Sequence, residues 1–157
     1  KETKKRCLNF MSKVFKVGLI GCGHIAETYF RAHKYFNNFK IIKCADINKS
    51  AAEKCAKIHR IKAVSIKELL NDKTINVILN LTIPAAHYKV SNQALIHGKH
   101  VYTEKPLAIS FQDGKRLIKL AKKKNLRIGN APDTFLGGGS QKSRALLDKK
   151  VIGKVRL

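Results

Sequence analysis

A glycine-rich turn between an apolar run and a helical pattern constrains the fold of this chain more than any other feature. The segment VGLIGCGHIA (17–26) indicates a strand buried on both faces, a turn with two glycines and the start of a helix. A strand, a tight turn and a helix in this order form the first unit of a parallel α/β sheet. Whether the turn also holds a ligand depends on the residues in the rest of the chain.

The rest of the sequence repeats this alternation of apolar runs and helical patterns. Strands are expected at 14–20, 39–47, 63–64, 76–81, 100–103 and 126–129, and helices at 24–36, 50–58, 65–70, 84–97, 110–124 and 140–149. The short connections predict a Rossmann-type doubly wound parallel sheet, a three-layer α/β/α fold in a single domain. We expect this dinucleotide-binding domain to cover 13–150, between a disordered basic lead at 1–12 and a connecting segment at 151–157.

The predicted helix ends rest on capping residues. Ser50 with Glu53, Ser65, and Ser110 with Asp113 are expected to cap helix starts. Pro84 suits a first helical turn, and Gly98 suits the position just after a helix.

In such a fold the glycine turn has the composition of a pyrophosphate cradle. Gly21 permits a turn that a side chain would hinder, Gly23 lets the backbone approach the ligand, and Ala26 allows close packing of helix and strand. A helix starting at His24 would present free N–H groups to the phosphates. The pattern predicts a dinucleotide site, although two glycines also suit a plain tight turn.

Asp46 lies at the end of the second expected strand, about 20 residues beyond the glycine turn, which is the usual spacing of a ribose-binding acid. A carboxylate there accepts hydrogen bonds from ribose hydroxyls and repels a 2′-phosphate, so it favours NAD over NADP. Lys49 nearby weakens this preference. The alternative is an Asx turn in which Asp46 only closes the strand.

The segment HVYTEKPLA (100–108) leads a strand directly into Glu104, Lys105 and Pro106. Proline disfavours the α conformation at Lys105, and ligands of open parallel sheets bind at the carboxyl ends of the strands. Lys105 is therefore a candidate for polarising a hydroxyl or a carbonyl beside the cofactor. The alternative is an ordinary surface lysine.

These segments resemble the cofactor domain of the Gfo/Idh/MocA oxidoreductases, which include glucose–fructose oxidoreductase and inositol dehydrogenase. The resemblance covers about residues 16–157. It rests on VGLIGCGHIA (17–26), ADIN (45–48), TIP (82–84) with His87, and above all GKHVYTEKPLA (98–108). APDTFLG (131–137), with Arg144 and Ile152–Gly153, is similar to a subgroup of the family.

The resemblance implies a set of cofactor contacts. Gly21, Gly23, His24 and Ile25 would hold the pyrophosphate, and Asp46 the adenosine ribose. Leu81, Thr82, Pro84 and His87 would line the cofactor pocket. Glu104 and Lys105 would lie near the nicotinamide, with a Lys105–Pro106 bond that is often cis in the family. Lys105 would be the catalytic residue, assisting the substrate hydroxyl as hydride moves; for His87 the alternative is capping of nearby backbone.

Family members also have a second, mainly antiparallel β domain that carries the substrate pocket, an Asp and a His for proton transfer and, in many members, the oligomer interface. None of the six histidines of this chain matches that pair. The chain is thus expected to be the cofactor-binding half of an NAD-dependent dehydrogenase of a sugar, polyol or related CH–OH substrate, inactive alone. Whether it forms a homo-oligomer is left open. The alternative is a non-catalytic, dinucleotide-sensing regulator.

The net charge of +23 raises the question of nucleic-acid binding. The chain has 26 Lys but only 7 Arg, whereas sequence-reading nucleic-acid binders favour Arg. The lysines spread over every expected helix, which indicates a biased composition. Charge-driven nucleic-acid binding is kept as a remote alternative.

The remaining composition indicates a cytoplasmic protein that does not bind membranes. No apolar run approaches the length of about 20 residues that spans a bilayer, and the basic N-terminus lacks the apolar core of a secretory signal. The four cysteines show no CxxC spacing. We interpret them as buried thiols and predict no metal site.

Overall fold

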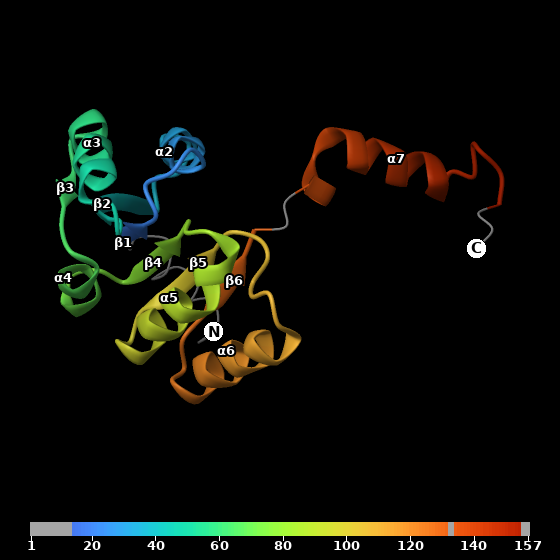
Figure 1. The fold of residues 1–157 in the computed structure, drawn as a ribbon. Coiled ribbons are helices and arrows are strands. Elements are labelled where there is room, and N and C mark those ends of the chain that lie inside the picture. The colour runs from blue at the N-terminus through green and yellow to red at the C-terminus, as the bar shows by residue number, and fades with distance from the viewer. Residues whose placement is uncertain (1–13, 132–133, 155–157) are drawn as a thin grey trace, which may run out of the picture.

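The computed structural model describes residues 14–131 and 134–154 of the chain. Six parallel strands form one sheet in the order β3-β2-β1-β4-β5-β6 (Figure 1). The strands are β1 (Phe15–Ile20), β2 (Phe39–Ala45), β3 (Lys62–Ala63), β4 (Val77–Asn80), β5 (His100–Thr103) and β6 (Ile128–Asn130). The helices are α2 (Ala26–His33), α3 (Lys49–His59), α4 (Ile66–Asn71), α5 (Pro84–Ile96), α6 (Phe111–Lys123), the 3₁₀ turn η1 (Thr134–Leu136) and α7 (Gly138–Asp148). This strand order confirms the predicted Rossmann-type fold.

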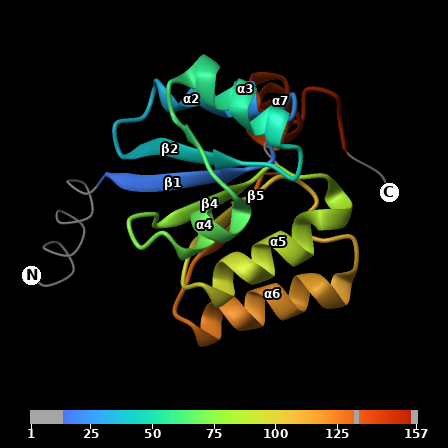
Figure 2. The same cartoon turned by 60° about the vertical axis from the view of Figure 1, so that its left-hand side comes forward.

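Helices cover both faces of the sheet, which gives the predicted three layers (Figure 2). On one face, α2 and α3 pack on the sheet through Phe30, Cys55 and Ala56. On the other face, α4, α5 and α6 pack through a second apolar cluster that includes Leu69, Leu95 and Leu117. Because both faces are buried, Val17–Ile20 of β1 and Val77–Leu79 of β4 are continuous apolar runs rather than alternating ones.

Two of the predicted caps are wrong in detail. Helix α3 starts at Lys49, because Asn48 is the N-cap and its side chain accepts a hydrogen bond from the Ala51 N–H, so Ser50 lies inside the helix. Ser110 is the N-cap of α6, but its side chain makes no capping hydrogen bond. The predicted cap at Ser65 is confirmed, and it is a full capping box that was not predicted, since Ser65 and Glu68 exchange side-chain and backbone hydrogen bonds of 2.8 and 3.1 Å.

Helix α2 begins at Ala26 rather than at the predicted His24. A tight turn comes first, in which the Ala26 N–H donates to the Gly23 carbonyl at 3.1 Å. Strand β6 likewise begins at Ile128, two residues later than predicted. The ends of α5 match the prediction, with Pro84 in its first turn and Gly98 following it at φ +75°.

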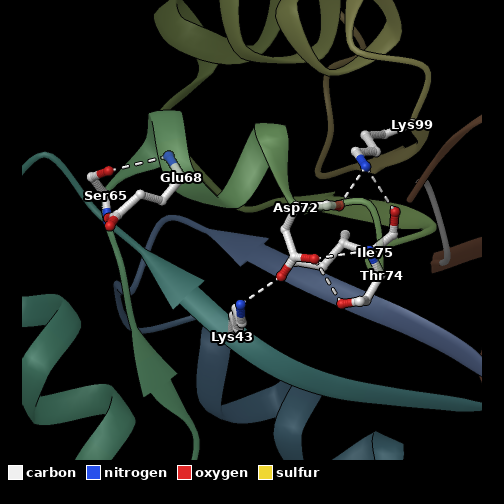
Figure 3. A network of polar contacts seen from close by, with 7 residues as sticks. All are labelled: Lys43, Ser65, Glu68, Asp72, Thr74, Ile75 and Lys99. Carbon is white, nitrogen blue, oxygen red and sulfur yellow. Dashed lines mark hydrogen bonds and ion pairs between the residues drawn. The ribbon is translucent and has the colours of Figure 1, made fainter.

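A network of polar side chains ties the loop between α4 and β4 to its neighbours (Figure 3). Asp72 accepts from the Lys43 ammonium of β2 with one carboxylate oxygen and from the Thr74 N–H and hydroxyl, both at 2.8 Å, with the other. From the other side, the buried Lys99 ammonium donates to the carbonyls of Asp72 and Ile75 at 2.6 and 3.0 Å. The loop is thereby fixed to β2 and to the start of β5.

Helix α7 stands apart from the sheet (Figure 1). It has no buried residue, and Phe135, Leu136, Val151 and Ile152 beside it are exposed. The predicted lead at 1–12 and residues 155–157 of the predicted connecting segment lie outside the described residues. Within 14–131 and 134–154, no helix combines the length and the apolar character that a membrane span needs.

Candidate functional site

The sheet brings most of the predicted site residues to its carboxyl edge. Gly21 follows β1, Asp46 follows β2, Leu81 follows β4, and Glu104 and Lys105 follow β5. Between β1 and β4 the order of the strands along the chain reverses direction, and in open parallel sheets ligands bind at this switch point. The predicted residues therefore line one continuous edge around the point where a ligand is expected.

The backbone conformation and the packing of the chain itself require a glycine at Gly21. Its φ is +103°, and a Cβ built on it would lie 2.6 Å from the Leu81 carbonyl and 2.7 Å from the Thr82 nitrogen. Its N–H donates to the Ala45 carbonyl at 3.0 Å. Gly21 thus holds the end of β1 between the ends of β2 and β4, where any side chain would overlap with backbone.

Gly23, in contrast to Gly21, has open space around it. A Cβ built on it would meet no atom of the described chain within 4 Å, and its φ lies outside the left-handed region. His24 and Ile25 beside it are also exposed. Neither packing nor backbone strain requires a glycine here. The space that a side chain would fill is therefore available to a ligand that approaches the backbone closely, as a pyrophosphate does in this type of turn.

Asp46 makes the Asx turn that the sequence analysis gave as the alternative, and it also contacts the glycine turn. One carboxylate oxygen accepts from the Asn48 N–H at 2.9 Å, which is the Asx turn at the end of β2. The other accepts from the Cys22 N–H at 2.7 Å and so fixes the carboxylate against the glycine turn. Each oxygen can accept a further hydrogen bond, so the Asx turn does not exclude ribose hydroxyls.

Asn80, which the sequence analysis did not select, organises the segment after β4. It is fully buried, and its amide donates to the His87 carbonyl and to the Ser91 hydroxyl at 3.1 and 3.0 Å. Its oxygen accepts from the Thr82 hydroxyl at 2.7 Å and from the Thr82 N–H at 3.3 Å. The sequence does contain a signal for Asn80, because it is the one polar residue at the end of an otherwise apolar strand. Asn80 holds Thr82 at the switch point.

The His87 side chain is buried, and both of its ring nitrogens contact backbone carbonyls. Its Nδ1 lies 2.6 Å from the Pro106 carbonyl, and its Nε2 lies 2.8 Å from the Thr82 carbonyl. The ring therefore joins the segment after β4 to the segment after β5, which corresponds to the backbone-capping alternative. Pro84, in contrast, is exposed in the first turn of α5. Any influence of His87 on a cofactor would pass through the two segments that it joins.

Glu104 and Lys105 lie in a well-supported turn. The Glu104 carboxylate accepts from the Tyr29 hydroxyl at 2.8 Å and from the Lys105 N–H at 3.0 Å. The Asn130 amide donates to the Thr103 and Glu104 carbonyls at 3.2 and 3.0 Å. The Lys105–Pro106 bond is cis, and the Lys105 side chain is exposed. Tyr29 and Asn130 were not predicted, because their role appears only when α2, β5 and β6 come together.

Two open pockets flank the glycine turn and the end of β2. One, of about 540 Å³, is lined by residues of the turn, including Gly23 and His24, and by α3. The other, of about 420 Å³, is lined by Asp46, Ile47, Val64 and Ser65. Asp46 thus borders a hollow of a size that an aromatic base with its sugar can enter.

The strand order, the open glycine turn and the acid after β2 define a Rossmann-type dinucleotide-binding domain. Residues 15–131 match the family model described as "Oxidoreductase family, NAD-binding Rossmann fold". The chain belongs to this family, the Gfo/Idh/MocA oxidoreductases, as the sequence motifs predicted.

Known proteins of this family are similar to the chain over most of its length. Inositol 2-dehydrogenase/D-chiro-inositol 3-dehydrogenase of Lacticaseibacillus casei is 30% identical over 150 residues, which cover 89% of this chain and 42% of that protein. Biliverdin reductase of Synechocystis sp. PCC 6803, solved with biliverdin and NADP⁺, is 29% identical, with a TM-score of 0.79 over 85% of this chain and 43% of that one.

A third similar protein is KijD10, a 3-ketoreductase of Actinomadura kijaniata solved with NADP and TDP-benzene. It is 26% identical, with a TM-score of 0.82 over 92% of this chain and 45% of that one. The chain spans less than half the length of the curated relatives that it matches.

Proposed function

We propose that this chain is the NAD(H)-binding domain of a dehydrogenase that acts on a CH–OH group of a sugar, a polyol or a related substrate. The observation that carries the proposal is the pairing of Gly23 with Asp46. The backbone at Gly23 is open to close approach, and the Asp46 carboxylate is fixed against the same turn through the Cys22 N–H. An open turn next to a fixed acid suits a pyrophosphate next to a ribose.

In this proposal the dinucleotide lies along the carboxyl edge of the sheet. The pyrophosphate lies over Gly23, His24 and Ile25, and the adenosine ribose binds Asp46. The nicotinamide end lies near Thr82, which Asn80 positions, and near Glu104. Leu81, Pro84 and His87 complete the surroundings of the site.

The preference for NAD over NADP rests on charge. A 2′-phosphate on the adenosine ribose would face the Asp46 carboxylate, and like charges at close range repel. Lys49, the first residue of α3, lines the same hollow and reduces this repulsion. Two of the similar solved structures hold NADP, so the preference needs a direct measurement.

Lys105 is proposed as the catalytic residue of this half. The nicotinamide ring supplies hydride chemistry when it is bound. The exposed Lys105 ammonium, at the end of β5, donates a hydrogen bond to the substrate oxygen, which stabilises negative charge on that oxygen. Glu104, fixed by Tyr29, holds the backbone N–H of Lys105 and so directs the start of its side chain. The inositol dehydrogenase relative supports a polyol as the substrate class.

The proposal is tested by titrating the chain with NADH and with NADPH while the nicotinamide fluorescence is recorded. We expect saturable binding, with NADH bound more tightly. Asp46→Ala removes charge-assisted hydrogen bonds worth about 1.5–3 kcal/mol, so NADH affinity falls about 10- to 100-fold and the preference over NADPH narrows.

Asp148→Ala, an acid on the exposed helix α7, serves as the control and leaves both affinities unchanged. No saturable binding of either nucleotide, or equal NADH affinity in Asp46→Ala and the parent chain, would refute the cofactor assignment. Turnover of a polyol by this chain by itself would contradict our expectation that it binds the dinucleotide without completing the reaction.

A further inference from the structure

Three cysteines that are far apart in the sequence meet beneath the glycine turn. Cys22 lies in the turn, Cys44 in β2 and Cys55 in α3. Their three Sγ atoms lie within 4.8 Å of one another. No sequence pattern indicated this cluster, because the spacings follow the fold and not a CxxC motif.

The separation of the sulfurs suits a shared metal ion. Zn²⁺ binds thiolate sulfur at about 2.3 Å, which places tetrahedral sulfur ligands about 3.8 Å apart. With no pair beyond 4.8 Å, each pair needs to close by at most about 1 Å. A disulfide, with an S–S bond of about 2.05 Å, would need a larger movement and would leave the third cysteine unused.

The cluster has an entry path. Cys22 and Cys55 line the pocket of about 540 Å³ beside the turn, whereas Cys44 is fully buried behind them. A cation can therefore reach the sulfurs from this pocket. The fourth tetrahedral position would face the pocket and so stay open to a water molecule or another small ligand.

The surroundings compensate the charge of such a site. Three thiolates and one divalent cation carry a net charge of −1. The pocket wall contains Lys54 and His24 besides one acid, Glu27, which lies 3.1 Å from His59, and the chain as a whole carries +23. His59, one turn after Cys55 on α3, lies close enough to stabilise negative charge on Cys55.

Two of the thiols donate to backbone carbonyls before any ion is bound. The Cys22 thiol donates to the Ala45 carbonyl at 3.7 Å, and the Cys44 thiol donates to the Ala52 carbonyl at 3.4 Å. Zn²⁺ binds thiolate, so an ion bound here would displace these protons.

We propose that Cys22, Cys44 and Cys55 form a three-thiolate site for a thiophilic divalent cation of the Zn²⁺ type. The ion would join the glycine turn, β2 and α3, the elements that surround Asp46. It would also stiffen the turn that presents Gly23. Thiolate ligands select such soft or borderline cations over Mg²⁺ and Ca²⁺.

Cd²⁺ is the probe, because its bonds to thiolate give a charge-transfer absorption in the ultraviolet. The chain is titrated under a non-thiol reductant in a Cys7→Ser background, so that the cluster holds all the remaining thiols. We expect the absorption to saturate at one Cd²⁺ per chain and Zn²⁺ to displace the Cd²⁺. Cys22→Ser, Cys44→Ser and Cys55→Ser should each weaken Cd²⁺ binding at least about 100-fold, since even changes outside the ligand set cost 10- to 100-fold.

The titration of the Cys7→Ser parent decides the proposal even where a cluster variant fails to fold. Absence of a saturable sulfur–cadmium absorption in that parent overturns it, and so does an absorption that persists in all three variants.

A second measurement is the rate of alkylation of Cys22 and Cys55 by iodoacetamide, read by mass spectrometry. We expect bound Zn²⁺ to slow both rates at least tenfold, and unchanged rates would count against the site. Cd²⁺ binding without NADH binding would leave this proposal standing and refute only the proposed function.

Discussion

Gly21 and Gly23 are separated by one residue, yet the described chain itself requires a glycine only at Gly21. At Gly21 the positive φ and the backbone of Leu81 and Thr82 exclude a side chain. At Gly23 no atom of the described chain does. A glycine that its own fold does not need is better explained by something that binds from outside. The two positions therefore separate a structural role from a binding role.

Alanine at each glycine tests this separation. Gly23→Ala should change the free energy of unfolding by less than about 0.5 kcal/mol, as expected for a surface site, while NADH affinity falls about tenfold or more. Gly21→Ala should lose at least about 2 kcal/mol, because left-handed backbone costs about 1–2 kcal/mol for alanine and the Cβ overlaps with backbone as well. Urea unfolding and NADH fluorescence titration provide the two measurements.

The decisive result is the combination of the free energy of unfolding and the NADH affinity measured for Gly23→Ala. A stable variant with unchanged NADH affinity would mean that no ligand approaches this part of the turn. An unstable variant would mean that the open space at Gly23 closes in solution. Only a stable variant with weak binding agrees with a pyrophosphate lying over Gly23.

At the scale of elements, the loop between α4 and β4 depends on one carboxylate. Asp72 faces the Lys43 ammonium and the two Thr74 donors, and its side chain is 12% exposed. The hydrogen bond from Lys43 holds the pKa of Asp72 well below its usual range, and Thr74 lowers it further. A carboxyl with a depressed pKa in the folded state stabilises the fold above the pKa of the unfolded chain, about 3.9, and loses this contribution as the pH falls below it.

Asp72→Asn should therefore flatten the acid limb of the stability curve. The free energy of unfolding, measured with urea at several pH values from 6 to about 2, should fall less steeply below pH 4 in Asp72→Asn than in the parent chain. Near pH 6 the variant should be less stable by about 1.5–3 kcal/mol, the usual value of a charge-assisted hydrogen bond.

Asp148→Asn is the matched control, since Asp148 pairs with Arg144 on the exposed surface of α7. Exposed ion pairs contribute about 0–1 kcal/mol, so its curve should follow that of the parent. Parallel acid limbs for Asp72→Asn and the parent would show that the Lys43–Asp72 pair does not stabilise the loop.

Local signals in the sequence predicted elements well where neighbouring residues decide the structure. Ser65 is the predicted N-cap of α4, and the Glu68 that completes its capping box lies within the same turn. Strand β5 has the predicted bounds, since the turn at Gly98 and the proline at Pro106 enclose it. At α3 the prediction chose Ser50, but the Asx turn at Asp46 brings Asn48 into position first.

The parts of the site that were missed depend on distant segments. Asn80, Tyr29 and Asn130 support predicted residues through contacts between elements that only the folded sheet brings together. The cysteine cluster is a further case, because β2, α3 and the glycine turn each supply one sulfur. The sequence predicted a helix at α7, but it could not show that none of its residues is buried.

At the scale of the whole molecule, the charge of +23 is the dominant property. So many like charges repel one another in the compact state and favour expansion of the chain. The ion pairs found among the described residues are few and mostly exposed, so they offset little of this repulsion. The stability of the fold should therefore depend on how well the solvent screens its lysines.

Added salt should stabilise this protein. Between about 10 mM and 150 mM NaCl the screening length falls from about 30 to about 8 Å, so repulsion between distant lysines is largely removed. We expect the Tm at pH 7 to rise by about 4 °C or more, which corresponds to about 1 kcal/mol for a domain of this size. Thermal unfolding followed by circular dichroism measures the change.

Lys119→Gln with Lys122→Gln, two exposed positions on α6, provides the matched variant. Removing two positive charges should raise the Tm in 10 mM NaCl and leave it nearly unchanged in 150 mM NaCl, because screening has then already removed the repulsion. Sucrose, which is uncharged, should raise the Tm of parent and variant equally. A Tm of the parent that does not respond to salt, or a variant whose gain persists in 150 mM NaCl, would show that charge repulsion does not limit the stability of the fold.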